Sequence, residues 1–506
     1  MDKTGLDRRS FLKASALVGS KFLVGATGLA SLTNCGSRSD WRSIQYPKIL
    51  LDNFRLFNGL NNSLQKGQII LIQGDKVLGI ERKGDLDQYK GFRHFDLNGW
   101  TLLPGLIDNH VHITSPFTTA GNLNVLFQKN EQFELNFRNC VMSGVTTVRD
   151  VGGFPGMIRK FTQRADKNKI PGPRVISSLS MIAAREGIQL GWPSYAPYIE
   201  DPILKRIMGG NFAERPRTVE EINEVCEEMV RLGAVWLKTL HQDQSFHHKG
   251  HRLPNHTDSE YKAILNKGRK HGIRCAMHAM FVSGFNKGVD LGYHTLEHTP
   301  MDAVITDRYA DRFTESDAAI IPTIRIFGDF LITRKLLKLI ETRGKEYLTS
   351  EALMQVTATV KKLLAIEDGH LSDEDRSGLR VDPLYFKDMF PNVIKNIAKL
   401  KSAGAKIGIG TDSGSTISLF GLFSDELKYV ASAGISNFET LRMATAENAR
   451  ILNMQDRIGT IEKGKWADLI AIEGDPLADL DSMNNVRMVM KGGAFIKSEG
   501  ITGLSV

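Results

Sequence analysis

The sequence predicts an α/β protein with a central parallel β/α array and two flanks made of short β segments. Between about Pro104 and Arg450, short apolar segments such as Arg174-Val175-Ile176-Ser177 and Ile320-Ile321-Pro322-Thr323 alternate with polar amphipathic stretches, as parallel strands with crossover helices require. The flanks, residues 47–100 and 458–498, contain alternating segments separated by Gly-Asp and Gly-Gly turn signals, including Gln68-Ile69-Ile70-Leu71-Ile72 and Val486-Arg487-Met488-Val489-Met490.

The first candidate site lies in the apolar segment Gly105-Leu106-Ile107-Asp108-Asn109-His110-Val111-His112. Side chains alternate between the two faces of a strand, so His110 and His112 point the same way. Two imidazoles on one face can bind one metal ion. A lone His-x-His pair is also compatible with two ordinary histidines on a half-exposed strand.

Four more candidates follow, each at the end of an apolar, strand-like segment. Lys238 sits among bulky apolar residues, where desolvation favours the neutral amine. His278 and His298 each end a short segment, and Asp412 follows Lys406-Ile407-Gly408-Ile409-Gly410-Thr411. Any one of them could be structural, but their succession favours a site.

These segments, in this order, resemble the amidohydrolase superfamily of metal-dependent hydrolases, and among them the imidazolonepropionase-like and Xaa-Pro dipeptidase-like enzymes. Ser143-Gly144-Val145-Thr146-Thr147-Val148-Arg149-Asp150 and Gly459-Thr460-Ile461-Glu462-Lys463-Gly464-Lys465-Trp466-Ala467-Asp468 extend the resemblance. It implies a TIM-type (β/α)8 barrel inserted in a small β-sandwich formed by both flanks. The expected domains are a signal at 1–35, sandwich halves at 36–103 and 451–506, and the barrel at 104–450.

The resemblance also implies two divalent metal ions, with zinc expected, and a hydroxide bridging them. His110, His112 and Asp412 would bind the more buried ion and His278 and His298 the other. Lys238 would carry a carbamate that bridges both, because an ammonium beside two dications would be repelled. Asp412 would also accept the proton of the attacking hydroxide and pass it to the leaving nitrogen, and Asp108 would orient a ligand.

The candidate substrate contacts lie after the third strand and just beyond Lys238. Related dipeptidases carry a Gly-Gly-His segment after the third strand, whereas this chain has Ala183-Ala184-Arg185-Glu186-Gly187. Arg185 is a candidate carboxylate clamp, or it pairs only with Glu186. His241 is a second candidate contact. We expect His294 to be a packing residue, and His247, His248 and His251 to lie in a solvated loop. Residues 333–400 predict helices, either an elaboration near the site or a solvated pair.

The expected function is hydrolysis of an amide C–N bond in a small substrate, such as an N-acyl amino acid, an Xaa-Pro dipeptide or a cyclic amide. One alternative is a mononuclear ring deaminase of the same superfamily, and another is a non-catalytic metal-binding lipoprotein of the cell envelope. Lys238 separates the first two, because a single-metal deaminase has no use for a bridging carbamate. The complete ligand set argues against the third.

The N-terminus predicts export. Asp7-Arg8-Arg9-Ser10-Phe11-Leu12-Lys13 resembles a twin-arginine signal, and Leu32-Thr33-Asn34-Cys35-Gly36 resembles a lipoprotein cleavage box, although Asn34 departs from the usual small residue. We therefore expect a bacterial periplasmic or envelope protein, with membrane contact only through a lipid on Cys35.

Composition bounds the partners and the redox chemistry. The chain has 506 residues, of which 42% are hydrophobic, and a formal net charge of +8. Residues 1–35 hold five basic and two acidic residues, so the charge without them is +5. No basic run interleaved with aromatic residues suggests nucleic acid. Cys140, Cys226 and Cys275 are too few for a disulfide framework. We expect a small-molecule substrate, and a homo-oligomer is compatible with the sequence.

Overall fold

The structure is a computed structural model that describes residues 41–117, 124–185, 187, 205–206, 210–244, 252–370, 383–415 and 417–502. From residue 42 onward these residues belong to one compact unit, Arg42–Val506. Among the described helices, none combines the length and apolar composition needed to cross a bilayer.

The central strands form a closed parallel barrel. In order round the ring they are β8 (Leu106–Val111), β9 (Val145–Asp150), β10 (Arg174–Ser177), β13 (Trp236–Leu240), β14 (Arg274–His278), β15 (Thr295–Glu297), β16 (Ala319–Ile321) and β17 (Lys406–Ile407). Every ladder between them is parallel. The Val235 N–H donates to Ser177 C=O at 3.0 Å and joins β10 to the β13 side. The short strand β11 (Met181–Ile182) continues β10 and also pairs with β13.

The ring closes between its first and last strands, β8 and β17. The Asn109 N–H donates to Ile409 C=O at 2.9 Å, and the Asp412 N–H donates to His110 C=O at 2.8 Å. Although β17 itself is only two residues long, the chain after it runs beside β8 as far as Ser413. The predicted strand ending at Asp412 is therefore only partly regular. A Cβ on Gly410 would lie 2.8 Å from the His110 backbone nitrogen, so this close approach requires glycine.

Helices return the chain between barrel strands, and their ends follow from the local sequence. They include α2 (Asn124–Met142), α3 (Pro155–Asp166), α6 (Val219–Leu232), α7 (Asp258–His271), α8 (Val282–Leu291) and α9 (Asp307–Glu315). Helix α7 starts with a capping box between Thr257 and Glu260. It ends at Gly272, whose φ of 65° is the left-handed conformation that terminates a helix just before the next strand.

The stretch predicted to be helical, residues 333–400, contains α11 (Thr333–Tyr347), α12 (Ser350–Glu367) and α14 (Pro383–Ser402). Asn396 on α14 accepts from the Ile305 N–H at 2.9 Å and donates to Pro300 C=O at 2.8 Å. Both groups lie in the segment that follows His298 at the carboxyl end of β15. This agrees with an elaboration near the site and not with a solvated helix pair.

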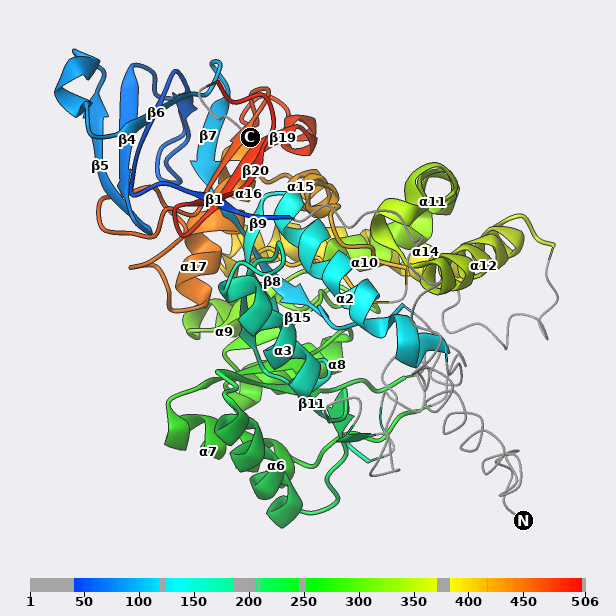
Figure 1. Ribbon diagram of the computed structural model, residues 1–506. Helices are drawn as coiled ribbons and strands as arrows, with labels where there is room; N and C mark the ends of the chain where they lie inside the picture. The colour runs from blue at the N-terminus through cyan, green and yellow to red at the C-terminus, as the bar shows by residue number, and fades with distance from the viewer. Residues whose placement is uncertain are drawn as a thin grey trace, which may run out of the picture. The chain divides into compact units, whose positions relative to one another are not determined.

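The flanks form two packed sheets. The order of the first is β1 (Ile44–Gln45), β20 (Ala494–Ser498), β19 (Val486–Lys491), β18 (Leu469–Ile472), β7 (Thr101–Pro104) and β3 (Arg55–Leu56). It therefore joins the two ends of the chain, seen in Figure 1 as red strands beside blue and cyan ones. The second sheet is β5 (Lys76–Arg82), β4 (Gln68–Gln73), β2 (Lys48–Asp52) and β6 (Arg93–Asp96).

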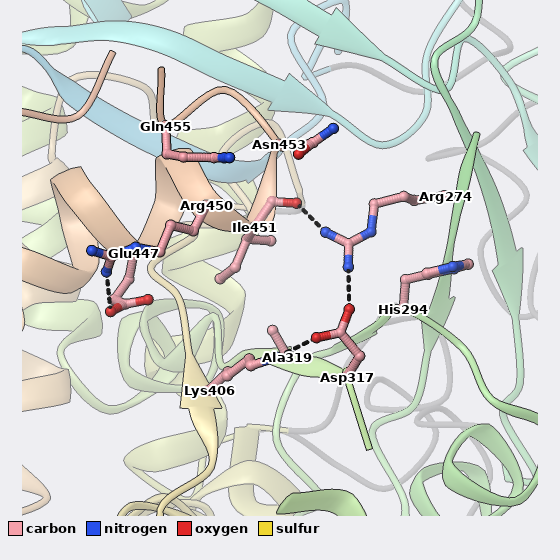
Figure 2. Close-up of a pocket in the computed structure, with 10 residues that line it drawn as sticks. All are labelled: Arg274, His294, Asp317, Ala319, Lys406, Glu447, Arg450, Ile451, Asn453 and Gln455. Carbon is pink, nitrogen blue, oxygen red and sulfur yellow. Dashed lines mark hydrogen bonds and ion pairs between the residues drawn. The ribbon is translucent and has the colours of Figure 1, made fainter. Parts of the chain in front are cut away.

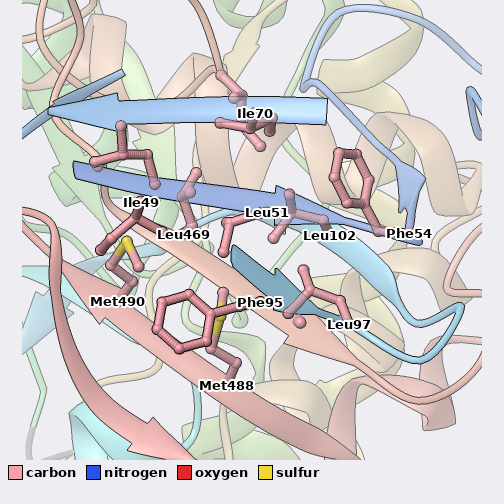
Figure 3. Close-up of a cluster of buried hydrophobic side chains, with 14 of the residues drawn as sticks. Ile49, Leu51, Phe54, Ile70, Phe95, Leu97, Leu102, Leu469, Met488 and Met490 are labelled. Atoms are coloured by element: carbon pink, nitrogen blue, oxygen red, sulfur yellow. The ribbon is translucent and has the colours of Figure 1, made fainter. Parts of the chain in front are cut away.

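A shared hydrophobic core holds these two sheets together. Leu51 and Phe95 from the second sheet belong to one buried cluster with Leu102, Met488 and Met490 from the first (Figure 3). Burial of this apolar surface is the main stabilising contribution of the sandwich. The expected fold class, a barrel inserted in a sandwich built by both flanks, is confirmed.

Candidate metal centre

The predicted ligands His110, His112 and Asp412 converge at one end of the barrel. His110 is on β8 and His112 follows it, so the alternation of the strand aims both rings at the same space. Asp412 Oδ1 lies 3.5 Å from His110 Nε2 and 3.4 Å from His112 Nε2. All three side chains are buried.

The two later histidines lie beside this group. The Nδ1 atom of His298 is 3.8 Å from Asp412 Oδ2, and its ring centroid is 4.8 Å from that of His110 and 4.4 Å from that of His278. Ligand atoms of His110, His298 and Asp412 all lie within 4.8 Å of one another. His278 ends β14 and is also buried. His278 and His298 lie at the carboxyl ends of the paired strands β14 and β15, whereas His110 lies on β8, and the barrel brings all three to one point.

The backbone is strained at this end of the barrel. His298, Thr323 and Asp412 have φ values of 70°, 45° and 52°, in the left-handed region that residues with a Cβ rarely occupy. Each comes directly after a barrel strand or its continuation. Such conformations persist only where the surroundings hold them, and they concentrate at functional sites.

The electrostatic environment suits metal binding. Burial lowers the pKa of all four histidines, to about 4 for His112, so the imidazoles are neutral, which is their metal-binding form. Burial also lowers the pKa of Lys238 to about 8 and raises that of Asp412.

Three buried polar atoms at this point find no hydrogen-bond partner among the described residues: His110 Nε2, Lys238 Nζ and Asp412 Oδ1. A buried polar group without a partner costs about 1–3 kcal/mol. A divalent ion would compensate the nitrogen and the carboxylate oxygen, and His and Asp are suitable ligands for zinc. The residues present therefore fit the metal centre that the sequence predicts.

A model of the amidohydrolase family matches residues 101–496, more than half of the chain. The chain belongs to the amidohydrolase family. A 5-methylthioadenosine/S-adenosylhomocysteine deaminase of Symbiobacterium thermophilum is 33% identical over 88 residues, which are 16% of this chain and 20% of that protein. The same enzyme of Desulforudis audaxviator is 33% identical over 138 residues, 24% of this chain and 31% of its own. The chain thus spans less than a third of either curated relative.

Solved structures of this family share the fold over nearly the whole chain. An Xaa-Pro dipeptidase with bound methionine is 22% identical, with a TM-score of 0.67, and the match covers 88% of this chain and 99% of that one. An Aspergillus niger ochratoxinase is 17% identical with a TM-score of 0.67, covering 91% and 98%. Phenylurea hydrolase B is 18% identical with a TM-score of 0.64, covering 88% and 96%. The resemblance of the motifs to the amidohydrolases is confirmed, and an Xaa-Pro dipeptidase is among the solved structures that share the fold.

The structure places the other sequence candidates as follows. Arg185 is exposed, shortly after β11. His241 follows β13, is buried, and engages both ring nitrogens, with Asp243 at 3.1 Å and Tyr261 at 3.0 Å. Arg185 and His241 both remain predicted substrate contacts, although both ring nitrogens of His241 already have partners within the protein.

Asp108 accepts from the His110 N–H at 3.1 Å and the Thr411 hydroxyl at 2.7 Å, so it fixes the backbone on either side of the site. His247, His248, His251 and Cys35 lie outside the described residues.

Each site histidine has a partner for its second ring nitrogen. His110 Nδ1 is 2.6 Å from Glu297 Oε2, and His112 Nδ1 donates to Gly152 C=O at 2.7 Å. His278 Nε2 is 2.9 Å from Gln242 Oε1, and His298 Nδ1 is 2.7 Å from Thr323 Oγ1. Such partners fix the orientation of the ring in which the other nitrogen would bind a metal. Sequence reasoning missed them; only Glu297, beside His298, gave a local signal, as a carboxylate in an apolar strand.

A separate cavity of about 670 Å³ lies at the opposite, amino-terminal ends of β14 to β17 (Figure 2). Arg274 and Lys406, the first residues of β14 and β17, both pair with Asp317. His294 also lines this cavity, and its Nδ1 accepts from the Cys275 N–H at 3.0 Å. His294 is therefore a packing residue, as expected, and not part of the metal centre.

Proposed function

We propose that this amidohydrolase holds two divalent ions, with zinc expected, and hydrolyses an amide C–N bond of a small substrate. His110, His112 and Asp412 would hold one ion, His278 and His298 the other, and a carbamate on Lys238 would join the two. When bound, the ions supply a water of lowered pKa and a Lewis acid for the scissile carbonyl.

The observation that carries this proposal is the burial of the Lys238 amine beside the proposed metal ligands. Its side chain is buried in β13, and its Nζ has no hydrogen-bond partner among the described residues. It is close enough to contribute to the lowered pKa of all four histidines and to oppose the raised pKa of Asp412. A cation among metal ligands is unfavourable. Once the ammonium has lost a proton, the neutral amine can add carbon dioxide, forming an N–C bond and releasing a second proton. A carbamate anion then stands in place of the cation.

The chain's own residues would then divide the work. Asp412 would take a proton from the attacking water and pass it to the departing nitrogen, which would leave as a neutral amine. Glu297, Gln242 and Thr323 hold the histidine rings in place. Burial excludes bulk water, which strengthens each of these electrostatic interactions.

Two observations support the substrate class. The solved neighbours include an Xaa-Pro dipeptidase, whose name describes cleavage of an amide bond before proline. The exposed Arg185 follows β11, at the carboxyl ends of the barrel strands, where the proposed metal ligands also lie. We therefore infer a substrate with a free carboxylate, such as an N-acyl amino acid or an Xaa-Pro dipeptide, with cyclic amides as a further class.

A mononuclear ring deaminase is the second candidate. Two observations favour it: the curated relatives described above are deaminases, and His110, His298 and Asp412 alone make a compact three-ligand group. Neither accounts for the buried, unpartnered Lys238. An assay of the purified protein against N-acyl amino acids, Xaa-Pro dipeptides, cyclic amides and aminopurine nucleosides tests both candidates. Turnover of the nucleosides alone would establish the deaminase.

We further propose that residues 1–35 form a twin-arginine signal that delivers the folded enzyme to the periplasm or envelope, with a lipid on Cys35 as its anchor. The domain division at 36–103, 104–450 and 451–506 belongs to the same proposal. Fractionation of cells expressing a Cys35→Ala variant tests the anchor: the protein should leave the membrane fraction. Retention there would refute the lipid but not export.

A further inference from the structure

Each of the four histidines has a hydrogen-bond partner for its second ring nitrogen, and the charge of these partners differs between the two proposed metal positions. On the side of His110 and His112, one partner is the carboxylate of Glu297 and the other is the carbonyl of Gly152. On the side of His278 and His298, the partners are the amide of Gln242 and the hydroxyl of Thr323, both neutral. All of these side chains are buried.

Glu297 is not a proposed metal ligand, but both of its carboxylate oxygens have hydrogen-bond partners. Its Oε2 is 2.6 Å from His110 Nδ1, while its Oε1 accepts from Arg149 Nη2 at 2.7 Å and from the Thr295 hydroxyl at 2.6 Å. Arg149 also donates to Asn109 C=O at 2.6 Å and stacks on the Trp236 ring at 4.5 Å. Arg149 supplies the opposite charge that a fully buried carboxylate needs.

Gln242 accepts a hydrogen bond from His278 much as Glu297 does from His110, but without a negative charge. Its Oε1 is 2.9 Å from His278 Nε2, and its own Nε2 donates to Gln244 C=O at 2.8 Å. An amide oxygen accepts the imidazole N–H without a net charge. It therefore orients the ring as Glu297 does but adds less to the basicity of the coordinating nitrogen.

We propose that the two metal positions are unequal in affinity and that Glu297 is the positioning residue that makes the His110–His112 position the tighter one. A carboxylate that accepts the imidazole N–H draws the proton toward itself and makes the opposite nitrogen a stronger donor to a metal. The chain then fills the His110–His112 position first, and the His278–His298 position only at higher metal concentration. This inference rests on the proposed two-metal function and adds an order of loading to it.

The test is a titration of the metal-free protein with Zn²⁺ in competition with a chromophoric chelator. The native chain should show two sites with clearly different dissociation constants. Glu297→Gln should weaken the tighter site by about ten- to a hundred-fold and bring the two constants together. Gln242→Met, the matched control on the other side, should weaken only the looser site, and Gln242→Glu should strengthen it.

Glu297→Gln leaves Arg149 without its carboxylate, so folding is checked by circular dichroism. If that variant does not fold, the double variant Arg149→Met/Glu297→Gln removes both charges together, which is usually far less destabilising than removing one. Two equal constants in the native chain, or a Glu297 variant that weakens both sites equally, would overturn the inequality and leave the two-metal proposal intact. Saturation at a single ion would overturn both.

Discussion

Asn448 is a buried residue whose side chain bonds both segments that meet where the barrel closes, so we predict that Asn448→Ala strongly destabilises the protein. Its Oδ1 accepts from the Ile409 N–H and from Asn109 Nδ2, both at 2.9 Å. Its Nδ2 donates to Ile107 C=O at 2.6 Å and to Ile409 C=O at 2.8 Å. One side chain thus joins β8 to the chain after β17, where no long ladder does so.

The size of the effect follows from the groups left without partners. Asn448 is fully buried, and alanine removes the acceptor of two donors that water cannot reach. At about 1–3 kcal/mol for each unsatisfied group, the loss is about 2–6 kcal/mol. Since folded proteins are stable by only about 5–15 kcal/mol, this is a large fraction of the total.

Urea denaturation followed by circular dichroism measures this loss. The control is Asn62→Ala, an exposed residue in the segment between β3 and β4, which should change the free energy of unfolding by less than about 0.5 kcal/mol. A loss below about 1 kcal/mol for Asn448→Ala would mean that the backbone contacts alone close the ring, and the reasoning would be wrong.

Three further predictions concern pH, export and the substrate. Burial raises the pKa of Glu426 from 4.5 to about 8, so the folded state holds a proton that the unfolded state has lost, and this contribution to stability declines as pH rises from about 4.5 to 8. Glu426→Gln should therefore gain stability relative to the native chain between pH 5 and 8. A pH-independent difference in urea midpoints between the two proteins would contradict this. Replacing Arg8 and Arg9 by lysine should trap precursor in the cytoplasm, and normal delivery to the envelope would refute the twin-arginine route. Arg185→Met should lower kcat/KM about ten- to a hundred-fold on a free-acid substrate but not on its neutral amide analogue; equal losses on both would make Arg185 structural.

The sequence predicted the parts of this molecule that depend on local pattern. Short apolar segments located β10 at Arg174–Ser177 and β14 at Arg274–His278, and the i, i+2 spacing placed His110 and His112 on one face. The order of the remaining candidate ligands along successive strands also held, because the carboxyl ends of parallel strands in a barrel meet at one face.

The supporting residues could not be predicted in this way, because their roles depend on contacts between distant segments. Asn448 is 339 positions from Asn109, and Arg149 is 148 positions from Glu297. The strand expected to reach Asp412 is regular only at Lys406–Ile407, because Gly408 and Gly410 bring the backbone so close to its neighbours that the pattern of apolar residues cannot reveal its path. The left-handed conformation at Thr323 likewise carries no sequence signal, since β-branched residues disfavour it.

The proposal that a carbamate on the buried Lys238 joins two metal ions can be tested by the metal content of the purified enzyme and of its Lys238→Ala variant, measured by elemental analysis on protein checked for folding. We expect close to two divalent ions per native chain, with loss of the second ion and of hydrolytic activity in the variant. A single ion per chain in both proteins, with activity surviving the change at Lys238, would contradict it.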